Sequence, residues 1–275
     1  PGPGRKHIYS DKIGLTDNKV VSLCWDSRGA LWIGCYGGLS RLVKGKIIPE
    51  LTNEGQVFDM VNAILEDHEG NMWVGAKDGL YRLNPKRFRA YTRKQGLLHN
   101  NIMSVMEDSQ DNLWIGTWGG GLHRLNESGM TAFGQNDGLM SDVVLALLED
   151  RAGALWVGMD FDHGMYRYWR GKFRRYYKKD GLEDRTVRVL HQDKEGNLWI
   201  GATSGLVQMN GGKFKRFTVK DGLSANTVRV IHEDRQGRLL VGTQGGLSML
   251  HEGKITNFGS EQGLPEEPIL ALHED

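Results

Sequence analysis

Short runs of apolar residues alternate along the whole chain with glycine-rich and charged segments. Residues 213–219 alternate basic and aromatic side chains, which is typical of a strand with one exposed face. Residues 227–232, 239–242 and 247–250 are brief apolar runs joined by an Asp-Arg-Gln-Gly turn and a Gln-Gly-Gly turn. The runs are too short for helices and the connections are tight, so the pattern predicts four antiparallel strands.

The same pattern returns through the sequence at a fixed period. Each copy is preceded by a Gly-Leu pair or a near equivalent, and successive pairs are 41 to 43 residues apart. The pairs begin at Gly14, Gly55, Gly96, Gly138, Gly181, Gly222 and Gly263. A four-stranded unit repeated at this spacing predicts an all-β fold, a β-propeller in which each repeat is one blade. We expect residues 1–275 to form one such domain.

The chain ends predict how the ring closes. Residues 6–10 resemble an outer strand and residues 268–275 an inner strand, with six complete blades between them. We therefore expect a partial seventh blade without its second and third strands, so that a propeller of the seven-bladed type is incomplete or open. Unpaired strand edges invite pairing with another chain, which predicts a homo-oligomer formed through these edges. We also expect the sequence to be part of a longer chain.

A tryptophan recurs once per repeat, in the second strand. The column holds Trp32, Trp73, Trp114, Trp156 and Trp199, with Leu240 in the sixth repeat. We expect these side chains to fill the gaps between neighbouring blades; the alternative is a ring of exposed stacking platforms.

Composition narrows the class of protein. The chain has 38 Gly but only 6 Pro, 39% hydrophobic residues and a net charge of +1, which excludes a collagen, a disordered chain and a small disulfide scaffold. No apolar stretch approaches the ~18 residues of a membrane span, and no signal peptide opens the sequence. The basic, aromatic segment 166–180 falls on a predicted outer strand, so we expect a solvated rim and no nucleic-acid partner.

The two cysteines are predicted to stay reduced. Centring the first hairpin on residues 27–29 pairs Cys24 with about residue 32 and Cys35 with about residue 21. The two thiols then lie beyond the reach of a disulfide.

The repeat resembles a known family. The pattern Glu-Asp-x-x-Gly-x-Leu-Trp-Ile/Val-Gly, as in residues 66–75, 107–116 and 149–158, is similar to the two-component regulator propeller repeat. The likeness covers nearly all of the chain after residue 5, although Asp111 replaces the turn glycine and Leu240 the tryptophan. It implies the extracytoplasmic, ligand-sensing part of a bacterial two-component or cyclase-linked receptor, with a ligand that is often derived from carbohydrate.

The candidate ligand site lies on one face of the predicted disc. Loops between second and third strands share a face with the connections between blades, here called the loop face; the other, the turn face, carries the Asp-x-x-Gly turns. The loops vary where the rest of the repeat does not. On the same face, two arginines stand in an inner-strand column that elsewhere holds Val21, Asn62, Met103, Leu145 and Leu270. Arginine and aromatic side chains suit a small polar ligand with a ring or an anionic group. The predicted ligand-binding residues are Tyr36, Lys77, Trp118, Asp160, Phe161, His163, Arg188, Arg229 and Gln244. The alternative is solvated loop tips.

Metal and enzyme chemistry are the other hypotheses. His191, His232 and His273 share a column that is otherwise apolar, so we expect packing there, and a metal only if the three converge on the channel. The segment 160–164 has too few oxygens for a calcium loop. We therefore expect a non-enzymatic sensor without cofactor or metal. The runner-up is an enzyme of the streptogramin-lyase kind, with His163 as base beside Asp160 and Asp162. A structural or protein-interaction propeller is the third reading.

Overall fold

The computed structural model describes residues 7–84, 87–161, 163–182, 186–262, 264 and 267–274. Within these ranges the chain forms six antiparallel sheets of four strands each, and strands consecutive in the sequence are neighbours. The first three blades are β1 (Val20–Trp25), β2 (Leu31–Cys35), β3 (Gly38–Val43) and β4 (Lys46–Glu50); β5 (Val61–Glu66), β6 (Met72–Ala76), β7 (Leu80–Asn84) and β8 (Arg87–Tyr91); and β9 (Ile102–Glu107), β10 (Leu113–Thr117), β11 (Leu122–Asn126) and β12 (Gly129–Phe133). The last three are β13 (Val144–Glu149), β14 (Leu155–Met159), β15 (Met165–Trp169) and β16 (Lys172–Tyr176); β17 (Val187–Gln192), β18 (Leu198–Ala202), β19 (Leu206–Asn210) and β20 (Lys213–Phe217); and β21 (Val228–Glu233), β22 (Leu239–Thr243), β23 (Gly246–His251) and β24 (Lys254–Phe258).

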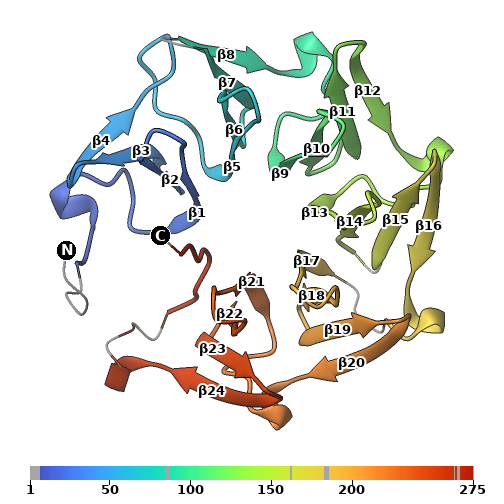
Figure 1. Ribbon diagram of the computed structural model, residues 1–275. Coiled ribbons are helices and arrows are strands. Elements are labelled where there is room, and N and C mark those ends of the chain that lie inside the picture. The colour runs from blue at the N-terminus through green and yellow to red at the C-terminus, as the bar shows by residue number, and fades with distance from the viewer. Residues whose placement is uncertain are drawn as a thin grey trace.

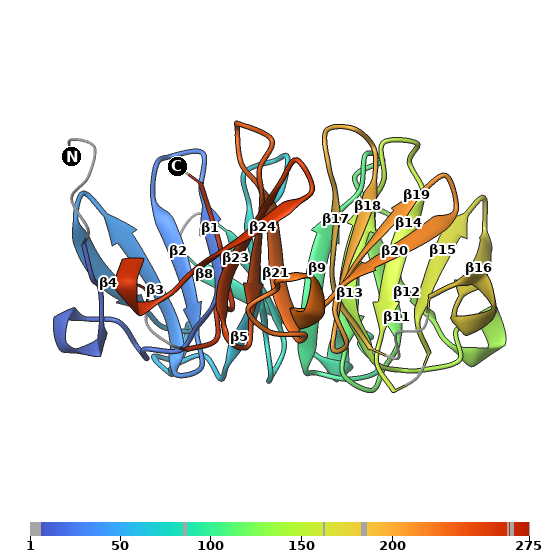
Figure 2. The same cartoon turned by 90° about the horizontal axis from the view of Figure 1, so that it is seen from below.

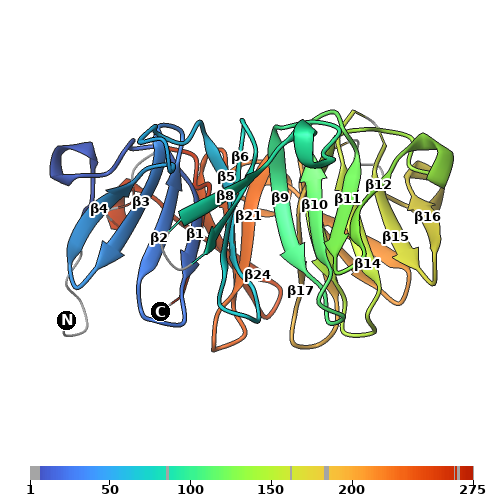
Figure 3. The same ribbon diagram turned by 90° about the horizontal axis from the view of Figure 1, so that it is seen from above.

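The six blades are arranged around a central channel, which confirms the predicted propeller (Figure 1). The inner strands β1, β5, β9, β13, β17 and β21 face the channel, and the fourth strands form the rim. Edge-on views show a disc with short 3₁₀ helices along the loop face (Figures 2 and 3). These helices are η1 (Asp11–Ile13), η2 (Arg93–Gln95), η3 (Gln135–Asp137), η4 (Lys178–Asp180), η5 (Val219–Asp221) and η6 (Ser260–Gln262).

The hydrophobic core lies between neighbouring blades. Trp114 is 2% exposed and packs with Leu155 and Val157 of the following blade. Its indole N–H donates to Asp108 Oδ2 of its own turn at 2.7 Å, so the ring is fixed at both ends. The other tryptophans of the column are likewise buried. The gap-filling prediction is confirmed, and no indole face of the column is free to act as a stacking platform.

The glycine after each second-strand tryptophan allows the blades to approach. At Gly201, an added Cβ would lie 2.7 Å from the Val228 Cγ1 of the next inner strand. A real Cβ does not tolerate such a contact, so the close approach of two sheets requires glycine. This explains why Trp-x-Gly repeats as a unit.

A clasp that the sequence did not predict links each blade to the next. The last residue of the inner strand in blades two to six, and Glu274 at the corresponding position of the C-terminal segment, accepts a hydrogen bond from a backbone N–H in the turn of the preceding blade. Glu233 Oε2, for example, accepts from Lys194 N at 2.9 Å. The remaining clasps are Ser27–Glu66, His68–Glu107, Ser109–Glu149, Arg151–Gln192 and Arg235–Glu274. Blade one has Trp25 at the acceptor position, so it offers no such clasp toward the gap in the ring.

The predicted partial seventh blade is not confirmed. Among the described residues, neither 7–10 nor 267–274 forms a strand. A β-strand needs a neighbouring strand to pair with, and no described segment forms a ladder with residues 267–274. A homo-oligomer formed through these edges stays a prediction.

The segment 267–274 nevertheless lies where an inner strand would lie. Ile269 N donates to Thr243 O at 3.0 Å, and the Ile269 side chain approaches Gly242 as Val228 approaches its own glycine. Glu274 completes the sixth clasp. The segment therefore covers the open side of blade six and runs beside the gap toward β1 (Figure 1).

The first hairpin has nearly the predicted register. Cys24 pairs with Trp32, and Cys35 pairs with Val20, because a bulge shifts the ladder by one residue. Both cysteines are free, as predicted. Burial raises the pKa of each thiol, which favours the protonated form of both at neutral pH.

Candidate functional site

Every inner strand has a β-bulge near the loop face. The ladder between the first and second strands skips one residue there in all six blades of the described chain. A bulge leaves its extra residue unpaired and re-aims the side chain. The skipped residues are Val21, Asn62, Met103, Leu145, Arg188 and Arg229. They are the column singled out in the sequence, so the bulges give the two arginines a special position beside the channel.

Arg229 is held by one neighbour and lies close to another cation. Its Nε and Nη2 donate to Gln244 Oε1 at 3.2 and 2.8 Å. Burial lowers the pKa of its guanidinium, the positive charge of Arg188 lowers it further, and Tyr36 acts in the opposite direction. An arginine stays protonated at neutral pH even so. The two predicted residues Arg229 and Gln244 are therefore brought together, with Arg188 nearby.

A cavity of about 450 Å³ lies at the gap between blades six and one. Arg229 and Gln244 line one wall, Lys19 and Tyr36 the opposite wall, and residues 267–271 the side between them. Lys19 Nζ is 5.3 Å from the centre of the Tyr36 ring, a cation–π contact. Three of the predicted site residues thus share one cavity on the loop face.

Trp118 and Phe161 form a second group on the loop face, from blades three and four. Their rings meet edge to face at 5.9 Å, and they are 37% and 59% exposed. Phe161 has a φ of +54°, which a bulky residue adopts only under strain. The structure pairs these two predicted residues, but they do not line the cavity at the gap.

The other predicted residues are already engaged. Asp160 is 7% exposed and its carboxylate accepts hydrogen bonds from the Thr186 hydroxyl and the Phe161 N–H, so it ties the loops of blades four and five together. The backbone oxygen of His163 accepts from Arg175 Nε at 3.0 Å. Lys77 Nζ lies 3.4 Å from Asp59 Oδ2. Asp162, the partner expected in a lyase-like site, lies outside the described residues.

The histidines of the inner-strand column lie apart from one another. In the described part of the chain, the ring nitrogens of His191, His232 and His273 do not come together as a set of ligands. His191 and His232 instead face Glu233 and Glu274, at 4.0 and 3.8 Å, next to the clasps. Burial lowers the pKa of His191. The packing interpretation accounts for this column.

A different set of potential ligands lies on the turn face. His68 Nδ1 is 2.7 Å from Glu107 Oε1 and 3.4 Å from Asp111 Oδ1, and the hydrogen bond to Glu107 raises the pKa of His68. Asp111 has a φ of +61° where the other blades have glycine in this turn. The three groups satisfy one another as exposed ion pairs, and we assign them no ligand.

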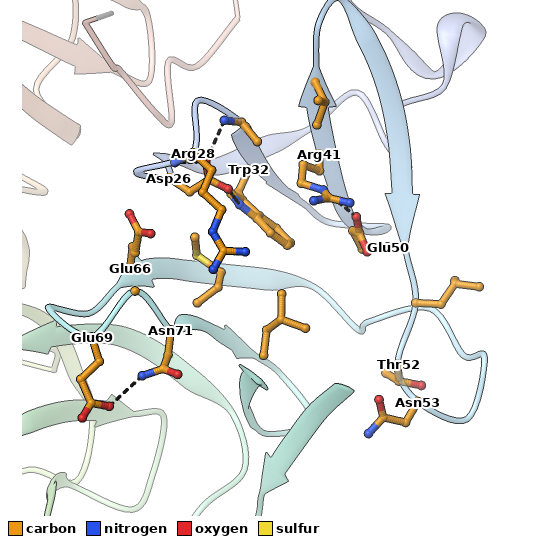
Figure 4. A pocket seen from close by; sticks show the side chains of 16 residues that line it. Asp26, Arg28, Trp32, Arg41, Glu50, Thr52, Asn53, Glu66, Glu69 and Asn71 are labelled. Atoms are coloured by element: carbon orange, nitrogen blue, oxygen red, sulfur yellow. Dashed lines mark hydrogen bonds and ion pairs between the residues drawn. The ribbon is translucent and has the colours of Figure 1, made fainter. Parts of the chain in front are cut away.

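A larger cavity, of about 970 Å³, lies between blades one and two (Figure 4). In the next four blades, an aromatic ring of the outer strand packs on the tryptophan of the same blade at 5.2–5.8 Å; blade one has Glu50 there instead, bound to Arg41 at 2.8 Å. The four ring pairs are Trp73–Tyr91, Trp114–Phe133, Trp156–Tyr176 and Trp199–Phe217. The missing ring leaves more space here than at the equivalent place between blades five and six, where Trp199 and Phe217 line a cavity of about 500 Å³. The carboxylates of the larger cavity are largely occupied, since Asp26 holds Trp32 and Glu66 forms a clasp.

These features define a repeat propeller with six four-stranded blades in the described chain and a polar cavity between blades six and one. The model of the two-component regulator propeller family matches six segments, which together exceed half of the sequence. They are residues 14–37, 55–78, 96–119, 138–161, 181–204 and 222–245. The chain belongs to this family.

Solved structures with the same fold include sensor domains and enzymes. The extracellular domain of BT3049 from B. thetaiotaomicron, described as a hybrid two-component system, has a TM-score of 0.81 and 19% identity over 95% of this chain and 38% of its own. The extracellular domain of BT4673 from the same organism, described as a one-component system, has a TM-score of 0.61 and 18% identity over 88% and 43%. Virginiamycin B lyase from Staphylococcus aureus has a TM-score of 0.70 and 14% identity over 87% and 84%.

The chain spans less than half the length of the two extracellular domains. At these identities the likeness establishes the fold alone. No curated protein matches the sequence significantly. In the described part of the chain, no helix has the length and apolar character needed to cross a membrane.

Proposed function

We propose that this propeller is a non-enzymatic sensor that binds a small polar ligand, of carbohydrate type, on its loop face. The cavity at the gap carries the proposal, because Tyr36, Arg229 and Gln244 converge there from two blades that are far apart in the sequence. An aromatic ring beside fixed polar donors is the usual composition of a small-molecule site. Trp118 and Phe161 add exposed aromatic surface on the same face.

The proposed location is extracytoplasmic, with the signal passed to an output domain. Support comes from membership of the regulator family and from the likeness to two extracellular domains of bacterial signalling proteins. An enzyme of the lyase type has less support. Its candidate carboxylate, Asp160, already accepts two hydrogen bonds within the fold, which leaves it poorly placed to bind a metal.

The test uses isothermal titration with neutral disaccharides, cellobiose and maltose, and with the acidic disaccharide digalacturonate. We expect saturable binding of at least one sugar, and we expect Tyr36→Ala, which removes the aromatic ring of the cavity, to abolish it without lowering the melting temperature. Trp118→Ala tests whether the second aromatic group of the loop face also contacts the ligand, and Trp169→Ala is its matched control, because Trp169 ends β15 at the turn face. Unchanged affinity in Tyr36→Ala would sink the proposed site, and unchanged affinity in Trp118→Ala would sink the assignment of that residue. A stoichiometric divalent ion in the purified protein would instead favour the enzyme.

A further inference from the structure

The two arginines of the bulge column have no acidic partner. Within the described residues, neither Arg188 nor Arg229 forms an ion pair, and Gln244, the one hydrogen-bond partner of Arg229, is neutral. Two arginines on the blades show the contrast: Arg41 pairs with Glu50 and Arg82 with Glu69, the latter at 2.9 Å. Arg41 and Arg82 are thus each compensated by a carboxylate, whereas the pair beside the channel is not.

Arg188 also has a buried hydrogen-bond donor without an acceptor among the described residues. Its Nε is inaccessible to solvent and has no hydrogen-bond partner among the described residues. A buried donor without a partner costs about 1–3 kcal/mol, and more when it is charged. Two neighbouring cations add electrostatic repulsion, as the effect of Arg188 on Arg229 shows. Such an arrangement is stabilised when an anion binds to it.

The surroundings define what kind of anion fits. Lys19 adds a third positive charge in the same cavity as Arg229, and Tyr36 adds an aromatic ring that is 43% exposed. Glu267 is the acidic residue of the lining, and it is exposed and makes no ion pair with the described arginines. The cavity volume of about 450 Å³ suits one or two sugar rings. The cavity itself presents the guanidinium of Arg229 and the ammonium of Lys19 to a ring-sized space, and Arg188 stands at the neighbouring bulge position beside Arg229.

We propose that Arg188 and Arg229 together bind the acidic group, a carboxylate or a sulfate, of a sugar-sized ligand seated against Tyr36. This inference rests on the proposed function and adds the chemical class of the ligand. Guanidinium groups bind carboxylate and sulfate through paired, charge-assisted hydrogen bonds, which a neutral sugar cannot form. The site therefore selects acidic sugars over their neutral counterparts.

The experiment compares two matched pairs of probes by isothermal titration: digalacturonate with galactobiose, and galactose 6-sulfate with galactose. We expect the intact protein to bind at least one acidic member more than tenfold tighter than its neutral counterpart. Arg188→Gln and Arg229→Gln should each reduce that preference at least tenfold. Arg89→Gln is the matched control, because Arg89 is an exposed rim arginine that stacks on Tyr91, and it should keep the preference.

Thermal melting separates binding from a structural role. Because each Gln variant removes a repulsive charge, both are expected to melt at or above the temperature of the intact protein. Absence of an acidic preference in both probe pairs overturns the inference, as does a preference retained in Arg188→Gln. If galactobiose or galactose binds in a Tyr36-dependent way with no effect of charge, the proposed function stands and this inference fails alone.

Discussion

His123 gives the fold a dependence on pH that can be calculated from the structure. The side chain lies in β11 directly after the buried Leu122, is fully inaccessible, and accepts a hydrogen bond at Nε2 from the Leu98 N–H at 3.0 Å. Burial lowers the pKa of His123 from 6.5 to about 4. The folded protein therefore holds a neutral imidazole with its proton on Nδ1, since Nε2 is the acceptor.

The sign and size of the effect follow from proton linkage. Below pH 6.5 the imidazole of His123 binds a proton in the unfolded chain but stays neutral in the folded chain. The contribution of this group to the free energy of unfolding is therefore complete above pH 6.5 and is lost as the pH falls toward 4. A shift of this size corresponds to about 3 kcal/mol in total, and to about 2.5 kcal/mol at pH 4.5.

Urea unfolding at pH 7.0, 5.5 and 4.5, followed by tryptophan fluorescence, measures this loss. His123→Gln is the test variant, because the amide oxygen of Gln can accept the Leu98 N–H but does not titrate. The intact protein should lose about 2.5 kcal/mol more than the variant between pH 7.0 and pH 4.5, whatever other groups contribute. Parallel losses in the two proteins would refute the reasoning.

Two further changes test the blade architecture. Asp193→Ala removes the acceptor of the Trp199 indole and of the Asn197 amide, both at 2.7 Å, and two orphaned buried donors should lower the stability by about 3–5 kcal/mol. Asp234→Ala, in the blade without a tryptophan, should cost less, and equal falls in melting temperature would contradict this account. Glu50→Tyr gives blade one the ring that its neighbours have; filling the cavity should outweigh a partly exposed ion pair worth about 0–1 kcal/mol and raise the melting temperature. The reverse change in blade two, Tyr91→Glu, should lower the melting temperature. A lower melting temperature in Glu50→Tyr together with a higher one in Tyr91→Glu would refute the role given to the ring.

The architecture could be predicted because every blade of a propeller has the same fold, so its sequence pattern recurs at a fixed period. Each blade repeats the same tryptophan, glycine and turn aspartate, and the structure uses them for packing between blades, close approach and indole capping. The hairpin register followed to within one residue for the same reason. Contacts that depend on which strands meet were harder to predict. The clasps join residues about 40 positions apart, and nothing local indicates that a glutamate at the end of one strand serves the turn of another blade.

The candidate site was predicted in part, for physical reasons that differ between residues. Variable loops and the two arginines were visible as departures from the repeat. The bulge that re-aims Arg188 was not, because a bulge is a property of a strand pair. Asp160 could not be recognised as a tie between loops, since its partner Thr186 belongs to the next blade. Glu50, by contrast, was detectable, as one acidic residue in an otherwise aromatic column.

Blade one explains why the site lies where it does. Of the thirteen large hydrophobic residues that are exposed in the described chain, eight fall between residues 7 and 57. Val20, which starts the first inner strand, is only partly buried, whereas its five counterparts in the other blades are completely buried. No blade precedes β1 in the described chain, so no sheet covers it. A ring of near-identical blades presents the same residues to a ligand at every blade boundary. Selective binding at one place requires a boundary whose residues differ from the others. Among the described residues, the boundary between blades six and one differs from the other boundaries, because Tyr36 and Arg229 line one cavity there together with residues 267–271.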